Sequence, residues 1–181
     1  VSLDGSRLAV GAVFDDGATN SCQNCGAVYL FTFADTSFSG GTLAARLGDY
    51  LVNDQHVDLS VHLGAADEFG GSVSLDGNRL AVGAFADDGA NGTCSDCGAV
   101  YLFTFADSSF NGASLSARIG HGYSGGNNVN LAGIVENNDS LGSSVSLDGN
   151  RVAVGVVGDD GAANGCIDCG AAYLFTFANS S

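Results

Sequence analysis

The sequence has no lysine, no proline and no apolar run that approaches the roughly 20 residues of a membrane-spanning helix. Its five basic residues are all arginines and are outnumbered by 20 acidic residues, which gives a formal net charge of −15. A field of this sign repels phosphate backbones and anionic lipids, so we expect neither nucleic acid nor a membrane surface as a partner. Cations are favoured as partners, but a solubility role or adaptation to high salt explains the charge equally well.

Patterns for helices and for catalysis are also missing. Apolar residues recur with period two, and 28 glycines argue against long helices. His56, His62 and His121 share no position in the repeat described below, so a repeated histidine metal site is not expected. There is no nucleophile elbow and no carboxylate pair in an apolar setting. We therefore expect a protein that is not an enzyme; an enzymatic role would need a catalytic domain outside this segment.

What the sequence does contain is one segment in three copies. They begin at Val1, Val73 and Val145, a period of 72 residues. A fixed period of this kind indicates stacked structural units rather than one globule. We expect the chain to be a segment of a longer repeat array, or a mature product cut from one. The predicted units are residues 1–72, 73–144 and, as a partial copy, 145–181.

Each unit is predicted to be a set of short antiparallel strands. In the second copy, Val73–Leu75 and Arg79–Val82 flank an Asp-Gly pair, which is a strong hairpin signal. The next run, Ala99–Phe105, is apolar on both faces and so belongs between two sheets. Ser114–Ile119 adds a fourth strand. Four such strands with glycine-rich turns form one propeller-type blade, so we predict an all-β stack of 72-residue blades.

Several repeated positions are predicted to be structural. Leu80 and Val82 face one way and Ala81 and Gly83 the other, and a face of very small side chains lets another sheet approach closely. Arginines locked to a period are expected to be hydrogen-bond or ion-pair partners rather than a binding patch. They occupy two places in the repeat: Arg7, Arg79 and Arg151, and Arg46 and Arg118.

The copies diverge between residues 49–66 and 121–138. Agreement is limited to scattered positions, such as Val57 with Val129. In the first copy, alternation over residues 57–63 is compatible with a fifth strand, whereas the second copy is rich in glycine and asparagine. Two interpretations stay open: loops that carry binding specificity on a fixed scaffold, or drift in an exposed connection.

The segments Asp67–Gly77, Leu80–Ala84 and Gly98–Phe103 together resemble the FG-GAP repeat. That repeat forms the blades of the integrin alpha-subunit propeller and occurs in many bacterial secreted proteins. The resemblance covers roughly half of each copy. It implies an extracellular, non-catalytic, adhesive or structural role, often with calcium.

This sequence departs from the family pattern at several places. The proline of the family's Gly-Ala-Pro is replaced by Val13, Phe85 and Val157. In the third copy, Leu141 stands for the phenylalanine of the junction and Val156 for the alanine. The 72-residue unit is also longer than the family leads us to expect, mostly in the divergent connection.

Each copy carries a CxxC motif in the loop before its aromatic strand. The 68 residues between the first two motifs exceed the roughly 15–20 of zinc ribbons. A redox motif would need a thioredoxin-like βαβ setting, which is absent. The even number of cysteines and the extracellular resemblance favour disulfides within each loop. The predicted pairs are Cys22–Cys25, Cys94–Cys97 and Cys166–Cys169.

Pairs of aspartates open the same loops and are candidate calcium ligands, because Ca²⁺ prefers oxygen donors. They lack the alternate D-x-D-x-D-G spacing of the family's calcium loops. The other interpretation is a turn whose carboxylates accept backbone N–H groups. The candidate ligands are Asp15, Asp16, Asp87, Asp88, Asp159 and Asp160, with Asn24, Asp96 and Asp168 across the loop.

Glycosylation is a weaker expectation, because N-x-S/T sequons arise by chance in Asn- and Ser-rich loops. Three sequons begin at Asn91, Asn138 and Asn179, and the clusters Thr36-Ser37 and Ser108-Ser109 are candidates for O-linked sugar.

These observations lead to two functional hypotheses. The first is an extracellular structural or adhesive repeat protein whose partners are further copies of the same repeat, joined head to tail into a fibre. The second is a propeller head that binds a sugar or protein ligand with calcium through the divergent loops. Many more near-identical units in the full-length protein would favour the first, and about seven units with a distinct further domain the second.

Overall fold

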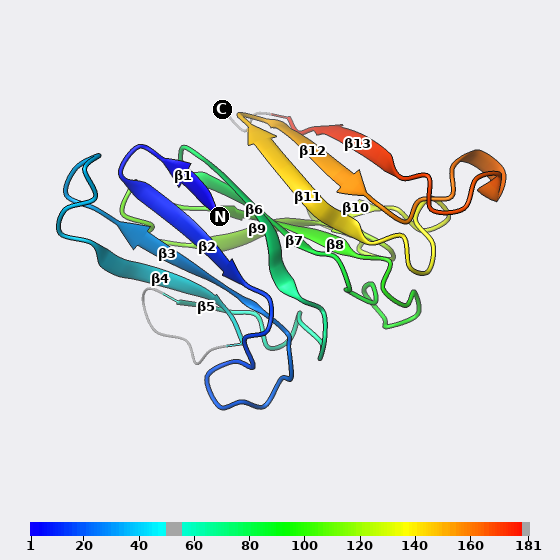
Figure 1. Cartoon of the computed structure of the whole chain (residues 1–181), viewed down its shortest axis with the longest axis horizontal. Coiled ribbons are helices and arrows are strands. Elements are labelled where there is room, and N and C mark those ends of the chain that lie inside the picture. The colour runs from blue at the N-terminus through cyan, green and yellow to red at the C-terminus, as the bar shows by residue number, and fades with distance from the viewer. Residues whose placement is uncertain (50–55, 179–181) are drawn as a thin grey trace.

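The computed structural model describes residues 1–49 and 56–178 and shows an all-β chain folded into three sheets. Figure 1 shows the sheets succeeding one another in chain order, from blue through green to yellow and red. The predicted all-β class is confirmed. Within the described residues the helical structure is a single 3₁₀ turn, η1 (Ala162–Asn164).

Every strand of the first two sheets neighbours the strand next to it in sequence. The first sheet has the order β1-β2-β3-β4-β5, the second β10-β9-β8-β7-β6 and the third β11-β12-β13. The first sheet comprises β1 (Ser2–Asp4), β2 (Arg7–Ala12), β3 (Ala27–Thr32), β4 (Thr42–Gly48) and β5 (His56–Asp58). The second comprises β6 (Phe69–Asp76), β7 (Arg79–Ala84), β8 (Ala99–Thr104), β9 (Ser114–Gly120) and β10 (Val129–Asn130). The third comprises β11 (Leu141–Asp148), β12 (Arg151–Val156) and β13 (Ala171–Thr176).

The hairpin predicted at each Asp-Gly pair is present. Asp76 pairs with Arg79 across the β6–β7 turn, and Gly77 has φ +53°. At the other end of the hairpin, β6 begins at Phe69, before the start of the copy at Val73, and a bulge follows Phe69. The junction residues are therefore the first part of a strand rather than a linker.

The divergent connections each add a short strand that runs parallel to its neighbour. Val57 on β5 pairs with Leu47, and Val129 on β10 pairs with Ile119. The strand in the first copy is shorter than the alternation over residues 57–63 suggested, since Val61 lies beyond it and is exposed. The glycine-rich second copy has a strand as well. The agreement of Val57 with Val129 therefore marks a position that pairs in both copies.

The small-residue faces of β2 and β7 lie against the following sheet, as predicted. A Cβ atom added to Gly11 would overlap the carbonyl oxygen of Gly70 on β6. One added to Gly83 would overlap the carbonyl oxygen of Gly142 on β11 in the same way. Absent side chains at these two positions let the backbones of successive sheets come into contact.

Each space between sheets is filled by one apolar cluster. β8 contributes to both: Tyr101 and Phe103 pack toward the first sheet, and Val100 packs toward the third. Phe69 meets the Tyr101 ring edge to face, with centroids 5.3 Å apart. The prediction that this strand is buried on both faces is confirmed.

Candidate functional site

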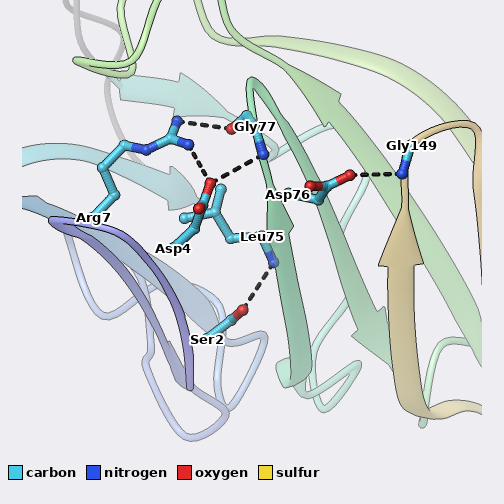
Figure 2. A network of polar contacts seen from close by, with 7 residues as sticks. All are labelled: Ser2, Asp4, Arg7, Leu75, Asp76, Gly77 and Gly149. Carbon is cyan, nitrogen blue, oxygen red and sulfur yellow. Dashed lines mark hydrogen bonds and ion pairs between the residues drawn. The ribbon is translucent and has the colours of Figure 1, made fainter.

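The most regular polar feature of the molecule joins one sheet to the next (Figure 2). The Ser2 hydroxyl accepts a hydrogen bond from the Leu75 N–H (2.9 Å). The Asp4 carboxylate accepts one from the Gly77 N–H (3.0 Å), and the Arg7 guanidinium donates to the Gly77 carbonyl (2.7 Å). Arg7 also pairs with Asp4, which fixes both side chains. We call this set of three hydrogen bonds the inter-sheet ladder.

The same ladder recurs between the second and third sheets. Ser74 accepts from the Leu147 N–H (2.9 Å). Asp76 accepts from the Gly149 N–H (2.6 Å), as Figure 2 shows, and Arg79 donates to the Gly149 carbonyl (2.7 Å). Equivalent atoms of equivalent residues are used at both junctions. The structural role predicted for this set of arginines is confirmed for Arg7 and Arg79.

The other two arginines lie among histidines of the connections. The Arg46 guanidinium lies 3.3 Å from Nε2 of His56 on the neighbouring strand β5. That of Arg118 lies 3.3 Å from Nδ1 of His62 and stacks over the Tyr123 ring, 4.3 Å from its centroid. His62 belongs to the connection before the second sheet, so Arg118 ties that connection to β9.

The first aspartate of each Asp-Asp-Gly sequence closes a turn. In the second copy, Asp87 accepts hydrogen bonds from the Gly89 N–H (2.8 Å) and the Tyr101 hydroxyl (2.8 Å). The third donor is the Tyr123 hydroxyl, 2.8 Å away. The other copies repeat the turn and the tyrosine contact: Asp15 with Gly17 and Tyr29, and Asp159 with Gly161 and Tyr173.

The second aspartate of each pair braces the loop from within. Asp88 accepts a hydrogen bond from the Asp96 N–H (2.9 Å), so the residue predicted to lie across the loop does so. Asp96 contributes its backbone N–H to this contact and not its carboxylate. The pairs Asp16 with Asn24 (2.7 Å) and Asp160 with Asp168 (2.7 Å) are equivalent. These hydrogen bonds are those of the turn interpretation, and calcium binding by these residues stays a prediction.

We expect calcium to have little effect on stability. Millimolar calcium and its chelation should change the melting temperature by less than about 2 °C, because a ligand stabilises a fold only in proportion to its differential binding. Differential scanning fluorimetry with and without EDTA measures this. Outright unfolding on chelation would show that the Asp-Asp-Gly loops hold a metal after all.

A search of protein-family models matches the FG-GAP repeat over residues 63–103 and 132–175. Both matched segments cover a junction, its hairpin and most of the aromatic strand. They are FG-GAP repeats. No curated protein matches the chain. Within residues 1–49 and 56–178, no helix combines the length and apolar character required to cross a membrane.

The CxxC loops take the same path in the three copies. The N–H of the first cysteine donates to the carbonyl of the second loop aspartate: Cys22 to Asp16 (3.3 Å), Cys94 to Asp88 (3.1 Å) and Cys166 to Asp160 (3.0 Å). A disulfide joins Cys166 to Cys169, whose Cα atoms are 5.7 Å apart. In the other two loops the structure departs from the prediction, since all four cysteines are thiols there. In the first loop the Cys25 sulfur nonetheless lies 3.0 Å from the carbonyl oxygen of Cys22, and the two sulfurs lie within 4.8 Å of each other.

The thiols of the first two loops are poorly suited to metal or redox chemistry. Burial raises the pKa of Cys22 and Cys94, with smaller contributions from nearby carboxylates. Burial also raises the pKa of Cys25 and Cys97 well above the usual range of a thiol. A raised pKa disfavours the thiolate, which is the nucleophile and the metal ligand. Asp49, which sequence reasoning missed, completes a possible three-ligand group with Cys22 and Cys25.

In an oxidising environment we expect all six cysteines to form disulfides within their own loops. The shared loop path gives each pair the approach that Cys166 and Cys169 have. Peptide mapping without reducing agent should recover each CxxC pair as an internally linked peptide. Free thiols, or Cys22 linked to Cys94, would contradict the expectation.

An acidic groove with a volume of about 630 Å³ lies beside the third CxxC loop. It is lined in part by Glu136, Asp139, Asp160 and Tyr173. Asp139 accepts a hydrogen bond from the Glu136 N–H (2.8 Å), and Asp160 braces its loop. In the second copy, the Tyr123 hydroxyl donates a hydrogen bond to Asp87, whose equivalent in the third copy, Asp159, lines the groove. The groove is thus a place where this polar cluster is open to solvent.

The predicted sugar acceptors among the described residues lie outside the ladder and the acidic groove. Asn91 and Asn138 are exposed, and Asn138 has a positive φ (+67°) where it approaches Gly158. Asn179 lies outside the described residues. The Thr36-Ser37 and Ser108-Ser109 clusters lie in exposed turns that Asp35 and Asp107 close.

Proposed function

We propose that this chain is a non-enzymatic, extracellular structural or adhesive repeat protein, whose sheets are propeller-type blades and whose partners are further copies of the same repeat. FG-GAP repeats are typical of extracellular or surface proteins, and two are present. The observation that carries the proposal is the inter-sheet ladder, which joins successive sheets through the same atoms at both junctions. Such a contact can extend a stack unit by unit.

The arrangement of polar residues also supports a structural role. The conspicuous carboxylates close turns or brace loops, and the ladder arginines bind backbone carbonyls. Carboxylates and guanidinium groups that make these hydrogen bonds stabilise the fold rather than bind a reacting substrate.

Immunogold labelling of thin sections of the source cells, with antibodies raised against this chain, tests the proposal. We expect label outside the cell, on the surface or along extended structures. Label confined to the cell interior would contradict the proposal.

A calcium-dependent binding head is the second candidate, and the acidic groove beside the third loop favours it. A glycan and protein array probed with and without EDTA separates the two. Binding that EDTA abolishes would support the head, whereas the structural role predicts no chelator-sensitive ligand.

A further inference from the structure

The first CxxC loop brings three candidate metal ligands together. The sulfurs of Cys22 and Cys25 and a carboxylate oxygen of Asp49 all lie within 4.8 Å of one another. Ligand atoms of a tetrahedral zinc site lie roughly 3.5–4 Å apart, because Zn–S bonds are about 2.3 Å and Zn–O bonds about 2.0–2.2 Å long. Small rotations of the three side chains therefore suffice to bring them onto one ion. Within residues 1–49 and 56–178, no other group of three cysteine, histidine or carboxylate ligands comes this close together.

The turn between the two cysteines is fixed mainly by backbone groups. The Cys25 N–H donates a hydrogen bond to the Cys22 carbonyl (3.3 Å), and the Cys25 thiol contacts the same oxygen (3.0 Å). Between them, Asn24 has φ +53°, and its N–H donates to the Asp16 carboxylate (2.7 Å). The two sulfurs are therefore positioned together before any ion binds.

Asp49 is held over this loop by contacts of its own. Its carbonyl accepts a hydrogen bond from the Ala18 N–H (2.8 Å), and its carboxylate accepts one from the Ser21 hydroxyl (3.3 Å). A Cβ atom added to Gly17 would lie 2.7 Å from the Asp49 carbonyl oxygen and 3.0 Å from Oδ2. The missing side chain at Gly17 thus leaves the space in which Asp49 approaches the cysteines.

The charges around the loop favour a cation. Burial raises the pKa of the Cys22 thiol, and three carboxylates raise it further, those of Asp49, Asp67 and Asp16. This cost of the thiolate applies to the loop without a cation. A divalent ion reverses it, because the same negative charges attract the ion and a coordinated thiol gives up its proton. Two thiolates with one carboxylate are ligands for Zn²⁺ rather than for Ca²⁺, which prefers oxygen alone.

We propose that the first CxxC loop of the reduced chain binds one Zn²⁺ through Cys22, Cys25 and Asp49, with a water molecule as the fourth ligand. Two Zn–S bonds and one Zn–O bond form, the two S–H bonds break, and both protons pass to solvent. The same sulfurs form the disulfide that we expect in an oxidising environment, so the ion and the disulfide are alternative ways to close one loop. This inference goes beyond the proposed function and does not depend on it.

Isothermal titration calorimetry with zinc chloride tests the inference on the whole chain, kept reduced by a phosphine. We expect one ion per chain with a dissociation constant below about 1 μM. Titration in buffers of different ionisation enthalpy should show the release of about two protons per ion, because both thiols are deprotonated on binding. With Co²⁺ in place of Zn²⁺, a near-ultraviolet absorption band from thiolate to cobalt should reach its full height at one equivalent.

Variants of the first loop identify the ligands. Cys22→Ser should abolish the cobalt band and weaken zinc binding at least about a hundredfold. Asp49→Ala should weaken binding at least about tenfold, because the loss of even an outer-shell partner of a metal site costs this much. Asp49→Asn, which keeps the shape of the side chain, should do the same and serves if the alanine variant fails to fold. Asp49→His should restore binding, since imidazole is a zinc ligand.

Cys94→Ser is the matched control in the second copy. There His121 stands 72 residues after Asp49, and within the described residues no third ligand completes a group with Cys94 and Cys97. This variant should bind one Zn²⁺ as tightly as the wild type. Circular dichroism verifies that each variant is folded. No zinc binding at about 10 μM, an equal loss in Cys94→Ser and Cys22→Ser, or unchanged affinity in both Asp49→Ala and Asp49→Asn would overturn the inference.

Discussion

Replacing Gly83 by alanine is expected to destabilise the protein by about 3 kcal/mol, which is large for the addition of one methyl group. The new Cβ would overlap the carbonyl oxygen of Gly142 and the hydroxyl of Ser72. The hydroxyl can rotate away, but the carbonyl belongs to the backbone of β11 and moves only if the third sheet does. The cost is therefore a local separation of two sheets along the ladder, with loss of packing on both sides.

Urea unfolding followed by circular dichroism measures this effect. With an m value of about 3 kcal/mol/M, the loss corresponds to a midpoint lower by about 1 M. Gly155→Ala is the matched control, because Gly155 holds the same position in the third sheet and its added Cβ would meet mainly the Ser144 hydroxyl. The control should cost less than about 1 kcal/mol. Equal losses in the two variants would show that contact between sheets is not the cause.

Much of the fold could be predicted from the sequence because its signals are local. The Asp-Gly pair at residues 76–77 fixes a hairpin, and alternation along β7 separates Leu80 from Gly83 on opposite faces. The two-sided apolar pattern of β8 identified a strand between sheets before any sheet was known. Comparison of the copies within the chain also predicted the structural role of Arg7 and Arg79. A charged residue that recurs at one position of every repeat tends to make a contact that stabilises the repeat.

The rest depends on which segments meet across sheets, which local patterns do not encode. The short parallel strands were visible in part, as the agreement of Val57 with Val129, but their direction was not. The sequence predicts the loop aspartates as possible metal ligands because it does not show which groups donate hydrogen bonds to them. In the structure these donors are backbone N–H groups and tyrosine hydroxyls from other strands. Likewise, Asp49 follows β4 in sequence, and its approach to the CxxC loop was not expected.

A pair of buried aspartates at the junction between the first two sheets was also not expected from the sequence. Asp67 is 6% exposed and Asp87 1% exposed, and each raises the cost of charging the other. Burial, followed by the charge of Asp87, raises the pKa of Asp67 to about 7. Burial also raises the pKa of Asp87, against the hydrogen bonds from Tyr101 and Tyr123. Ionisation of the buried Asp67 carboxyl near neutral pH therefore lowers the free energy of unfolding.

Stability is accordingly expected to fall as the pH rises from about 4 to about 7. An aspartate whose pKa is 3.8 when unfolded and about 7 when folded binds more protons in the folded state across this range, so removing protons favours unfolding. The loss should be on the order of 3 kcal/mol and level off above pH 7, where the Asp67 carboxylate is ionised in both states.

Asp67→Asn should remove most of this pH dependence and make the protein more stable than the wild type at pH 8. The amide stays neutral, and its oxygen can still accept the hydrogen bond from the Gly64 N–H that Asp67 receives (2.6 Å). Urea unfolding at pH 4.5, 6 and 8 gives the free energy of unfolding for both proteins. Asp107→Asn is the control: Asp107 is exposed, and hydrogen bonds from Asn111 and Ser109 lower its pKa, so its loss should leave the slope above pH 5 unchanged. A wild type whose stability is constant or rises between pH 4.5 and 8 would show that Asp67 is charged at little cost, and that the acidic pair does not oppose the stacking of the two sheets.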